Sequence, residues 1–376
     1  MKLTLSRTEL FNRMAIVGKI INPKTPVPVA ENYLFKVDGN RLTIVTTDLE
    51  TTLSTTMPLE AKSEKFVLAI PPKLMEVLKE MPEQLLHLDI DEESAKIEIK
   101  NDSGSYKGDF MGVNVGEEGE DFPKPRGLEG DVKTFELTSE LLYNGINKTI
   151  FAAAEEDSRP VMTGVLFDIF ENNITFVATD AHKLVKYNVE NVANGFEGSF
   201  ILPRKPANVL KNIVVKSDEK VKISFDDKNI VFELPEFTMI CRRIEGRYPN
   251  YNAVIQQNQL KIIVDRGSML SAIKRVKVFA NTGTGLIILK IGDNNLNIST
   301  QDLDFSTSAD ENVVCQYSDE EITIGFKAEL LEQLLSNMTD SQVMLELADP
   351  SKAGIIVPFE NTENEELIML LMPMFI

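Results

Sequence analysis

The residues best suited to chemistry are Asp180 and His182, which lie two positions apart in one short segment. An aspartate close to a histidine can serve as a general base or help to bind a metal ion. The only other histidine, His87, is far away in the sequence, so a metal site would lack ligands. Two cysteines, Cys241 and Cys315, are too few for a zinc site or a set of disulfides. The sequence therefore predicts no metal and no cofactor.

Asp180 has a counterpart in each of the other two thirds of the chain, and neither counterpart has a histidine nearby. The three residues are Asp48, Asp180 and Asp302, at steps of 132 and 122 residues. A residue that recurs three times is better explained as a turn residue at the end of a strand than as a catalyst. The chain also has no phosphate-binding glycine loop and no nucleophile elbow. We therefore predict no catalytic residue; the alternative is a hydrolase that uses Asp180 and His182.

Two further sequence markers repeat with similar spacing. A lysine that opens a helix-like segment recurs at the same two steps, and a bulky residue before proline recurs at steps of 126 and 124. The lysines are Lys73, Lys205 and Lys327, and the bulky residues are Phe122, Tyr248 and Met372. Repetition at this period predicts three copies of one domain rather than a solenoid. We place the domains at residues 1–127, 128–254 and 255–376.

Each copy has the same predicted plan of a helix, strands, a second helix and further strands. The helices are expected at residues 6–21, 72–81, 138–152, 204–216, 265–279 and 326–338. Ser6, Thr138 and Asp265 are suitable N-caps, and Glu9 would complete a capping box with Ser6. Short runs at 163–169 and 174–179 predict strands, as do the runs at 221–225 and 230–234, which show period-2 alternation. Two helices and about eight strands per copy predict an α+β fold, with helices on one side of antiparallel sheets.

The composition favours a soluble protein. A chain of 376 residues can form two or three domains that each bury a core. No apolar stretch approaches the roughly 20 residues of a membrane span, and the first residues lack the apolar segment of a secretory signal. We therefore expect a cytoplasmic location.

The net charge of −19 is unevenly distributed. The six expected helices carry +8, so the rest of the chain carries −27. A basic helical layer in an acidic body is typical of a protein that binds phosphate backbones on one face only. The alternative is that these lysines form ordinary solvated helix faces. The residues expected to contact phosphates are Lys24, Lys73, Lys148, Arg204, Lys205, Lys211, Lys274, Arg275 and Lys277.

The C-terminal segment Met372–Ile376 is apolar to its last residue. Chain ends are usually polar and frayed. The run before it is expected to be a core strand, and the tail either extends that core or lines a pocket for a partner peptide. Methionine-rich surfaces adapt well to varied partners, so the pattern leaves both interpretations open.

Several stretches of the chain resemble one family, and the resemblance spans the whole sequence. They are Arg159 with 163–167, then 178–184, 202–205, 245–251 and 372–374. In these stretches the chain is similar to the beta subunit of bacterial DNA polymerase III, the replicative sliding clamp. The resemblance implies a head-to-tail homodimer whose six domains close into a ring, with helices lining the hole and sheets outside.

The resemblance also implies a function without catalysis. Duplex DNA of any sequence would thread the hole and meet the basic helices, and the ring would act as a processivity factor. The replicative polymerase, the clamp loader and other partners would dock short peptides in a pocket between the second and third domains. The competing interpretation is an open scaffold that binds DNA or protein without encircling DNA.

The peptide pocket of the family can be transferred to matching positions of this sequence. These are Met162, Thr179, Ala181, His182, Lys183, Leu184, Pro249 and Val254 from the second domain, and Leu370, Leu371, Met372, Pro373 and Met374 from the third. The chain departs from the family at Ala181, Lys183 and Ala253 and at its Phe375-Ile376 end, which predicts a less basic and more apolar pocket. For the dimer interface we expect Val278 and Phe279 to meet a surface around Phe110.

Overall fold

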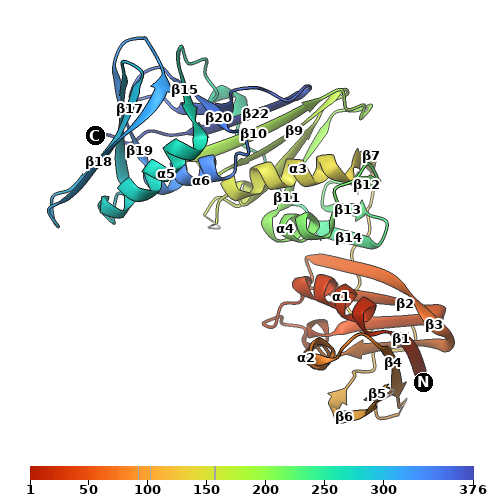
Figure 1. Cartoon of the computed structure of the whole chain (residues 1–376). Helices are drawn as coiled ribbons and strands as arrows, with labels where there is room; N and C mark the ends of the chain where they lie inside the picture. The colour runs from red at the N-terminus through yellow and green to blue at the C-terminus, as the bar shows by residue number, and fades with distance from the viewer. Residues whose placement is uncertain (92, 102, 156–157) are drawn as a thin grey trace. The chain divides into compact units, whose positions relative to one another are not determined.

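The computed structural model describes residues 1–91, 93–101, 103–155 and 158–376 (Figure 1). It divides into two compact units. Unit 1 consists of Met1–Tyr143 and Asn208–Arg243, and unit 2 consists of Asn144–Ala207 and Ile244–Ile376. The middle third of the chain contributes to both units, because its strands pair with strands of both neighbouring thirds.

Unit 1 contains two antiparallel sheets. The first has the order β1 (Lys2–Ser6), β4 (Leu85–Ile90), β5 (Lys96–Asn101) and β6 (Gly104–Met111). The second has the order β2 (Tyr33–Thr47), β3 (Thr51–Ile70), β14 (Phe237–Arg242), β13 (Asn229–Glu233), β12 (Lys220–Phe225) and β7 (Lys133–Thr138). Side chains alternate between core and surface along each strand. In β1, for example, Leu3 and Leu5 are buried and Lys2 is exposed.

Unit 2 contains one sheet of twelve strands. Its first block is β11 (Gly198–Pro203), β8 (Gly164–Ile169), β9 (Asn173–Thr179) and β10 (Lys183–Glu190). The order continues with β22 (Glu365–Leu371), β21 (Gly354–Pro358), β20 (Gln342–Leu347) and β15 (Leu260–Asp265). It ends with β18 (Thr307–Gln316), β17 (Asn295–Asp302), β16 (Leu286–Gly292) and β19 (Ile322–Lys327).

The six helices form where the sequence predicts them. They are α1 (Arg7–Val17), α2 (Lys73–Glu80), α3 (Ser139–Thr149), α4 (Arg204–Ile213), α5 (Arg266–Val276) and α6 (Ala328–Ser336). Single 3-10 turns extend α1, α3 and α5 to residues 20, 152 and 279. Within the described ranges, no helix is long and apolar enough to cross a membrane.

The predicted N-caps are confirmed, but the capping box is only half formed. The side chains of Ser6, Thr138 and Asp265 accept backbone N–H groups at 3.2, 3.2 and 2.7 Å. The Glu9 carboxylate lies 3.5 Å from the guanidinium of Arg13, one turn along the helix. The second bond of the expected box is therefore replaced by an i,i+4 ion pair.

The strands confirm the repeat, with one difference in the first copy. In the part of the chain that the structure describes, the second copy has eight strands, β7–β14, and the third copy also has eight, β15–β22. The first copy has only β1–β6, because β2 and β3 are 15 and 20 residues long and each takes the place of two strands. The expected 163–169, 174–179, 221–225 and 230–234 strands are β8, β9, β12 and β13.

The lysine marker is confirmed and the proline marker is wrong. Lys73 opens α2, Lys205 is the second residue of α4, and Lys327 directly precedes α6. Met372-Pro373 directly follows strand β22, whereas Tyr248-Pro249 lies several residues beyond the end of β14. These two pairs occupy different places in the repeat, so their regular spacing is coincidental.

Successive repeats are joined by strand pairing at two equivalent junctions. At the first junction β3 pairs with β14, and Thr51 lies opposite Cys241. At the second junction β10 pairs with β22, and Lys183 lies opposite Leu371. The next backbone contact is also shared, because Arg242 N–H donates to Glu50 at 2.9 Å and Met372 N–H donates to His182 at 2.8 Å. The two junctions therefore have the same register.

The core of the middle repeat depends on a close approach between a helix and a strand. The rings of Phe167 and Phe176 have centroids 4.8 Å apart, and Phe200 stacks on Phe167 at 4.7 Å. A Cβ atom on Gly145, inside α3, would lie only 2.4 Å from the Phe176 ring. Because Phe176 is fully buried between its neighbours, the ring has no free space to move into.

We predict that Gly145→Ala destabilises the protein although alanine is the better helix former. Overpacking of a tight core should lower the free energy of unfolding by roughly 1–3 kcal/mol, more than the gain in helix propensity. Thermal unfolding followed by circular dichroism measures the change. The matched control is Gly267→Ala in α5, where the new Cβ meets only ordinary contacts, and stability should rise by about 0.5–1 kcal/mol. Equal shifts for both variants would contradict the prediction.

Candidate functional site

The recurring aspartate forms the same hydrogen-bonded turn in all three repeats. One carboxylate oxygen of Asp180 accepts the N–H groups of His182 and Lys183 at 2.9 and 2.8 Å. Asp48 accepts from residues 50 and 51 at 3.1 and 2.7 Å, and Asp302 accepts from residues 304 and 305 at 2.9 and 3.2 Å. The predicted turn role is confirmed. His182 contributes its backbone to this turn, not an imidazole paired with Asp180.

The Asp180 turn differs from the other two in having a buried lysine. The Lys183 ammonium lies 2.5 Å from the second carboxylate oxygen of Asp180, and only 6% of the Lys183 side chain is exposed. Burial acts to raise the pKa of Asp180, but the hydrogen bonds from Lys183 and His182 and the Lys183 charge outweigh it, so the pKa lies below its usual value. Lys183 is therefore paired inside the protein.

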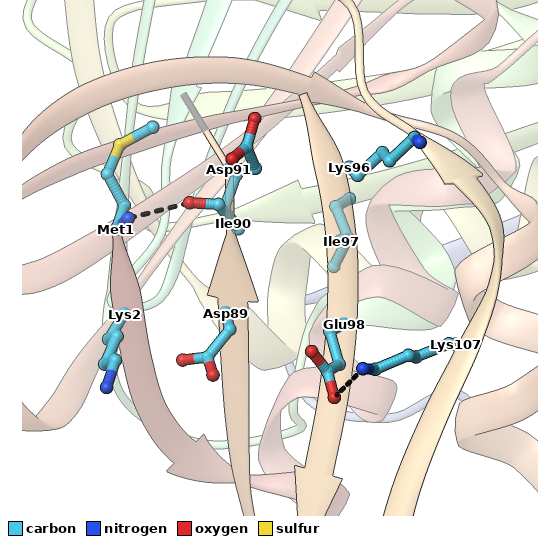
Figure 2. Close-up of a pocket in the computed structure, with 9 residues that line it drawn as sticks. All are labelled: Met1, Lys2, Asp89, Ile90, Asp91, Lys96, Ile97, Glu98 and Lys107. Carbon is cyan, nitrogen blue, oxygen red and sulfur yellow. Dashed lines mark hydrogen bonds and ion pairs between the residues drawn. The ribbon is translucent and has the colours of Figure 1, made fainter. Parts of the chain in front are cut away.

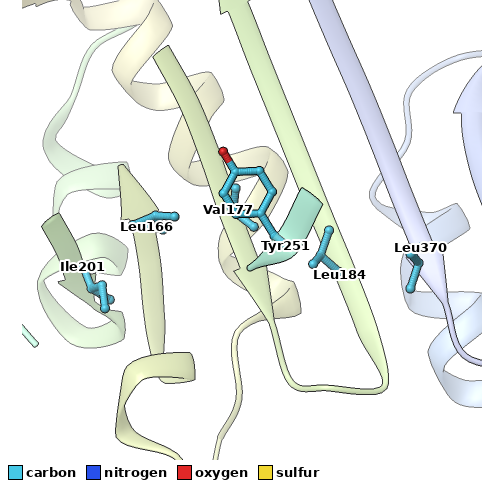
Figure 3. Packing of buried hydrophobic residues seen from close by; sticks show 6 residues of the cluster. All are labelled: Leu166, Val177, Leu184, Ile201, Tyr251 and Leu370. Atoms are coloured by element: carbon cyan, nitrogen blue, oxygen red, sulfur yellow. The ribbon is translucent and has the colours of Figure 1, made fainter. Parts of the chain in front are cut away.

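Pairing of β10 with β22 brings together the two predicted halves of the peptide pocket. Leu184 lies opposite Leu370, and both belong to one apolar cluster, shown in Figure 3. The cluster consists of Leu166, Val177, Leu184, Ile201, Tyr251 and Leu370. Tyr251 covers it from the segment after β14, and its hydroxyl donates to Asp168 at 2.8 Å. Leu184 and Leu370, 186 positions apart in the chain, thus belong to one buried cluster. We call this cluster, together with the exposed residues Ala181, Val254 and Met372, the apolar surface of unit 2.

The predicted pocket residues fall into two groups by exposure. Thr179, Lys183, Leu184, Leu370 and Leu371 are buried. Val254 and Met372 are 46% and 43% exposed, and Ala181 and His182 are also exposed. Met162, Pro249, Pro373 and Met374 are half-buried. The second group is the one that an apolar ligand can contact directly.

Sequence reasoning missed several members of this surface. Leu166, Val177 and Ile201 lie in the cluster, and Val161, Ile244, Tyr248, Ile255 and Ala353 pack around it. The nearly continuous apolar runs of β8 and β9 could have marked Leu166 and Val177 as buried residues. Ala353 and Ile255 carry no such signal, because only the folded sheet brings them to the cluster.

The equivalent positions of the other repeats are less apolar. Strand registers align Leu34 with Leu166 and Ile288, and Ala69 with Ile201 and Gly325. The full sets are Leu34, Val45, Thr52 and Ala69; Leu166, Val177, Leu184 and Ile201; Ile288, Ser299, Ser308 and Gly325. Only the second set is large and apolar at every position. In the first repeat, Leu34 and Ala69 form a separate cluster with Val115 and Phe122.

The C-terminal tail is held at two points. Met372 N–H donates to His182, and Met374 N–H donates to Gly325 at 2.8 Å. The Gly325–Met374 bridge has counterparts in the bridges Ala69–Val113 and Ile201–Ile244 of the other repeats. The tail therefore closes its own repeat as well as lining the surface. Phe375, in contrast, is 97% exposed.

Several of the nine cations expected to contact phosphates are paired with carboxylates of the same chain. Lys148 binds Glu365 at 2.9 Å and lies over the Tyr187 ring, and Arg204 binds Glu155 at 3.0 Å. Arg275 makes two bonds to Glu311, at 2.7 and 2.6 Å, and Lys277 binds Glu332. A paired cation attracts phosphate less strongly, so the charge of the helices overstates their attraction for DNA. Lys24, Lys73, Lys205 and Lys274 are exposed and Lys211 is half-exposed.

The expected dimer residues are unequally placed. Val278 is 75% exposed and Phe279 is also exposed, as a contact surface requires. Phe110 is only 5% exposed, so its side chain belongs to the core of its own sheet. Its neighbours Tyr106 and Met111 are the exposed apolar residues of β6. The surface expected around Phe110 stays a prediction, and its exposed side chains are those of Tyr106 and Met111.

A separate cavity of about 690 Å³ lies on the first sheet of unit 1 (Figure 2). Its lining includes a row of charges across four strands: Lys2, Asp89, Glu98 and Lys107. Lys107 and Lys100 neutralise the two carboxylates. Among the described residues, no three His, Cys, Asp or Glu side chains are grouped to hold a metal ion. The cavity therefore has a balanced charge row and no reactive group.

Comparison with known proteins covers the chain almost from end to end. Family models match for the N-terminal, central and C-terminal domains of the DNA polymerase III beta subunit, at residues 1–111, 136–250 and 253–374. The beta sliding clamp of Pseudomonas aeruginosa is 26% identical over 98% of this chain and 99% of its own. The beta sliding clamp of Chlamydia pneumoniae is 28% identical over 100% and 99%.

Solved structures agree with these matches. The crystal structure of the DNA polymerase III subunit beta from Pseudomonas aeruginosa superposes with a TM-score of 0.91 at 25% identity, with all of both chains covered. The beta subunit of Streptococcus pyogenes has the same fold, with a TM-score of 0.91 at 18% identity. Three clamp domains with antiparallel sheets and few helices account for the whole molecule. The chain belongs to the DNA polymerase III beta subunit family, the beta sliding clamps.

Proposed function

We propose that two copies of this chain form a ring around duplex DNA and tether the replicative polymerase to it through the apolar surface of unit 2. The protein is a processivity factor and catalyses no reaction. One observation supports the ring most directly: each chain has two complete junctions between repeats and one unpaired half-junction at each end of the series. We also propose domain boundaries near residues 127 and 254, and a cytoplasmic location.

The two half-junctions are the outer edges of β6 and β18. β6 is the last strand of its sheet, and β18 pairs with β15 only at Cys315 and Gln316. A cavity of about 770 Å³ follows the remaining edge of β18 and is lined by residues 311–316 together with α5. A strand of a second copy can fill this groove by adding to the sheet. Two copies joined head to tail satisfy both edges, as a closed ring requires.

The complete junctions predict the register of this contact. Each repeat has an isolated backbone bridge at Val113, Ile244 or Met374. Cys241 and Leu371 lie three residues before Ile244 and Met374, and Phe110 lies three residues before Val113. Phe110 of the second copy should therefore lie opposite Thr307, the residue that corresponds to Thr51 and Lys183. Antiparallel pairing in this register places Lys107 opposite Asp310, two opposite charges that are both exposed. Val278 and Phe279 remain candidates for the same contact.

The helices supply phosphate contacts that carry no sequence information. Of the expected residues, Lys73, Lys211 and Lys274 are the basis of the proposal, because they lie on three different helices and at least partly face solvent. Contacts of this kind hold DNA weakly and allow sliding. A closed ring needs no more than this, because topology rather than affinity keeps it on DNA.

We predict that the protein, loaded onto nicked circular duplex by a clamp loader, stays bound until the circle is cut. Changing Lys73, Lys211 and Lys274 to Ala should flatten the plot of log affinity against log salt by roughly 0.9 for each lost phosphate contact, about 2.7 in total. The control changes three strand lysines, Lys62, Lys96 and Lys261, and alters the net charge equally. Protein that leaves intact circles as fast as linear DNA would refute the ring, and equal slopes for both variants would refute the helix contacts.

We predict that single charge reversals at the proposed contact weaken the dimer. Lys107→Glu or Asp310→Lys places like charges opposite each other, which should cost about 1 kcal/mol at each of two contacts and raise the dimer Kd roughly thirtyfold. Sedimentation equilibrium measures this. The double variant restores opposite charges and should recover most of the affinity. If the double variant is as weak as the two singles combined, the register is wrong.

We predict that Val254→Ala with Met372→Ala lowers the affinity for a labelled Gln-Leu-Phe-type peptide at least tenfold, because anchors in such surfaces contribute ~2 kcal/mol or more. Fluorescence anisotropy measures the affinity. Truncation of Met372–Ile376 is a poorer test, because it also breaks the bonds to His182 and Gly325. Leu85→Ala, at an exposed apolar residue of the first repeat, is the control. Unchanged affinity of the double variant would remove the surface from the proposal.

A further inference from the structure

The Asp180 turn and the Asp48 turn share every backbone contact but balance their charge differently. Thr179 donates to Lys183 O at 2.7 Å and Thr47 donates to Thr51 O at 3.1 Å, and each threonine also accepts an N–H at 3.1 Å. The first turn therefore forms with a threonine in the place of Lys183. The lysine is not needed to shape such a turn, so its burial beside Asp180 calls for another explanation.

The cation at each junction has a different location. At the first junction the residue after the last paired position, Cys241, is Arg242, which is exposed and lies 3.9 Å from the Glu50 carboxylate. At the second junction the equivalent residue is Met372, and the cation is Lys183, buried within the turn. The first junction thus has an ion pair at the surface, between Arg242 and Glu50, whereas the second has one in the interior, between Lys183 and the turn carboxylate of Asp180.

At the outer face of the second junction, Met372 stands in the place of Arg242 and His182 in the place of Glu50. Ala181, Met372 and Val254 are exposed, and each lies within three residues along the chain of a member of the apolar cluster, namely Leu184, Leu370 and Tyr251. Asp180 is partly exposed, with 18% of its side chain accessible. Without the lysine, its carboxylate would project a negative charge onto an apolar surface in a chain of net charge −19.

We infer that Lys183 is a positioning residue of the peptide site: it neutralises Asp180 from the inside, so that the surface accepts apolar and acidic peptides, and it does not touch the peptide itself. This inference rests on the proposed function. This role differs from direct contact between a basic side chain and the peptide. Lys183 is not placed for such contact, because its side chain is buried and its ammonium is bonded to Asp180.

A double-mutant cycle with Asp180→Asn and Lys183→Met tests the inference. Affinity for two labelled peptides that differ only by Glu or Gln beside the apolar anchor is measured by anisotropy. Lys183→Met alone should weaken peptide binding roughly tenfold, because it leaves the Asp180 carboxylate unpaired. The loss should be larger for the Glu peptide, whose charge this carboxylate repels, and smaller at high salt. In the Asp180→Asn background the same change should have no further effect. Lys183→Arg, which restores the ion pair, should bind both peptides like wild type.

The outcomes separate the inference from the function on which it rests. If Lys183→Met does not fold, Asp180→Asn and the double variant decide by themselves, because they should bind alike. A further loss in the double variant, or an equal loss for both peptides, shows that Lys183 contacts the ligand or acts only on stability, and overturns the inference alone. If wild-type protein binds neither peptide, the peptide site itself fails and this role fails with it.

Discussion

The pairing of strands across the repeat boundaries is the interaction on which the rest of the molecule depends. β3 pairs with β14 and β10 pairs with β22 in the same register. Each pairing satisfies backbone groups that an isolated repeat would leave at an exposed edge. It also places the turn of one repeat against the end of the next, and this contact creates the candidate peptide surface. The unpaired edges of β6 and β18 follow from the same rule and motivate the proposed ring.

Three equivalent turns have become chemically different through a few side chains. The aspartate is constant because each turn needs an acceptor for two N–H groups. The four cluster positions vary, and only the second repeat fills all of them with large apolar residues. Since burial of apolar area drives peptide docking, this difference gives a physical reason to propose a peptide surface in the second repeat. The first two turns also differ in their ion pairs, because Arg242 lies near Glu50 at the surface and Lys183 is bound to Asp180 in the interior.

Charge in this protein cannot be interpreted from its distribution along the sequence alone. The helices are basic and the remainder is acidic, yet Lys148, Arg204, Arg275 and Lys277 are bound to nearby carboxylates. Internal pairing lowers the effective positive charge offered to DNA without changing the total. A ring that must slide benefits from such weak contacts, because tight phosphate binding would slow its movement.

The sequence by itself determined the threefold repeat, the helices and their caps, and the turn role of the aspartates. These follow from local rules: hydrogen-bonding side chains at helix starts, and periodic apolar residues. It did not reveal that Met372-Pro373 lacks a true counterpart, that Phe110 is buried, or that Lys183 is paired. Only the tertiary structure decided these points, together with the place of Ala353 and Ile255 beside the cluster. Strand register and burial depend on contacts between residues far apart in the chain, and a local pattern contains no information about which distant partner each residue will meet.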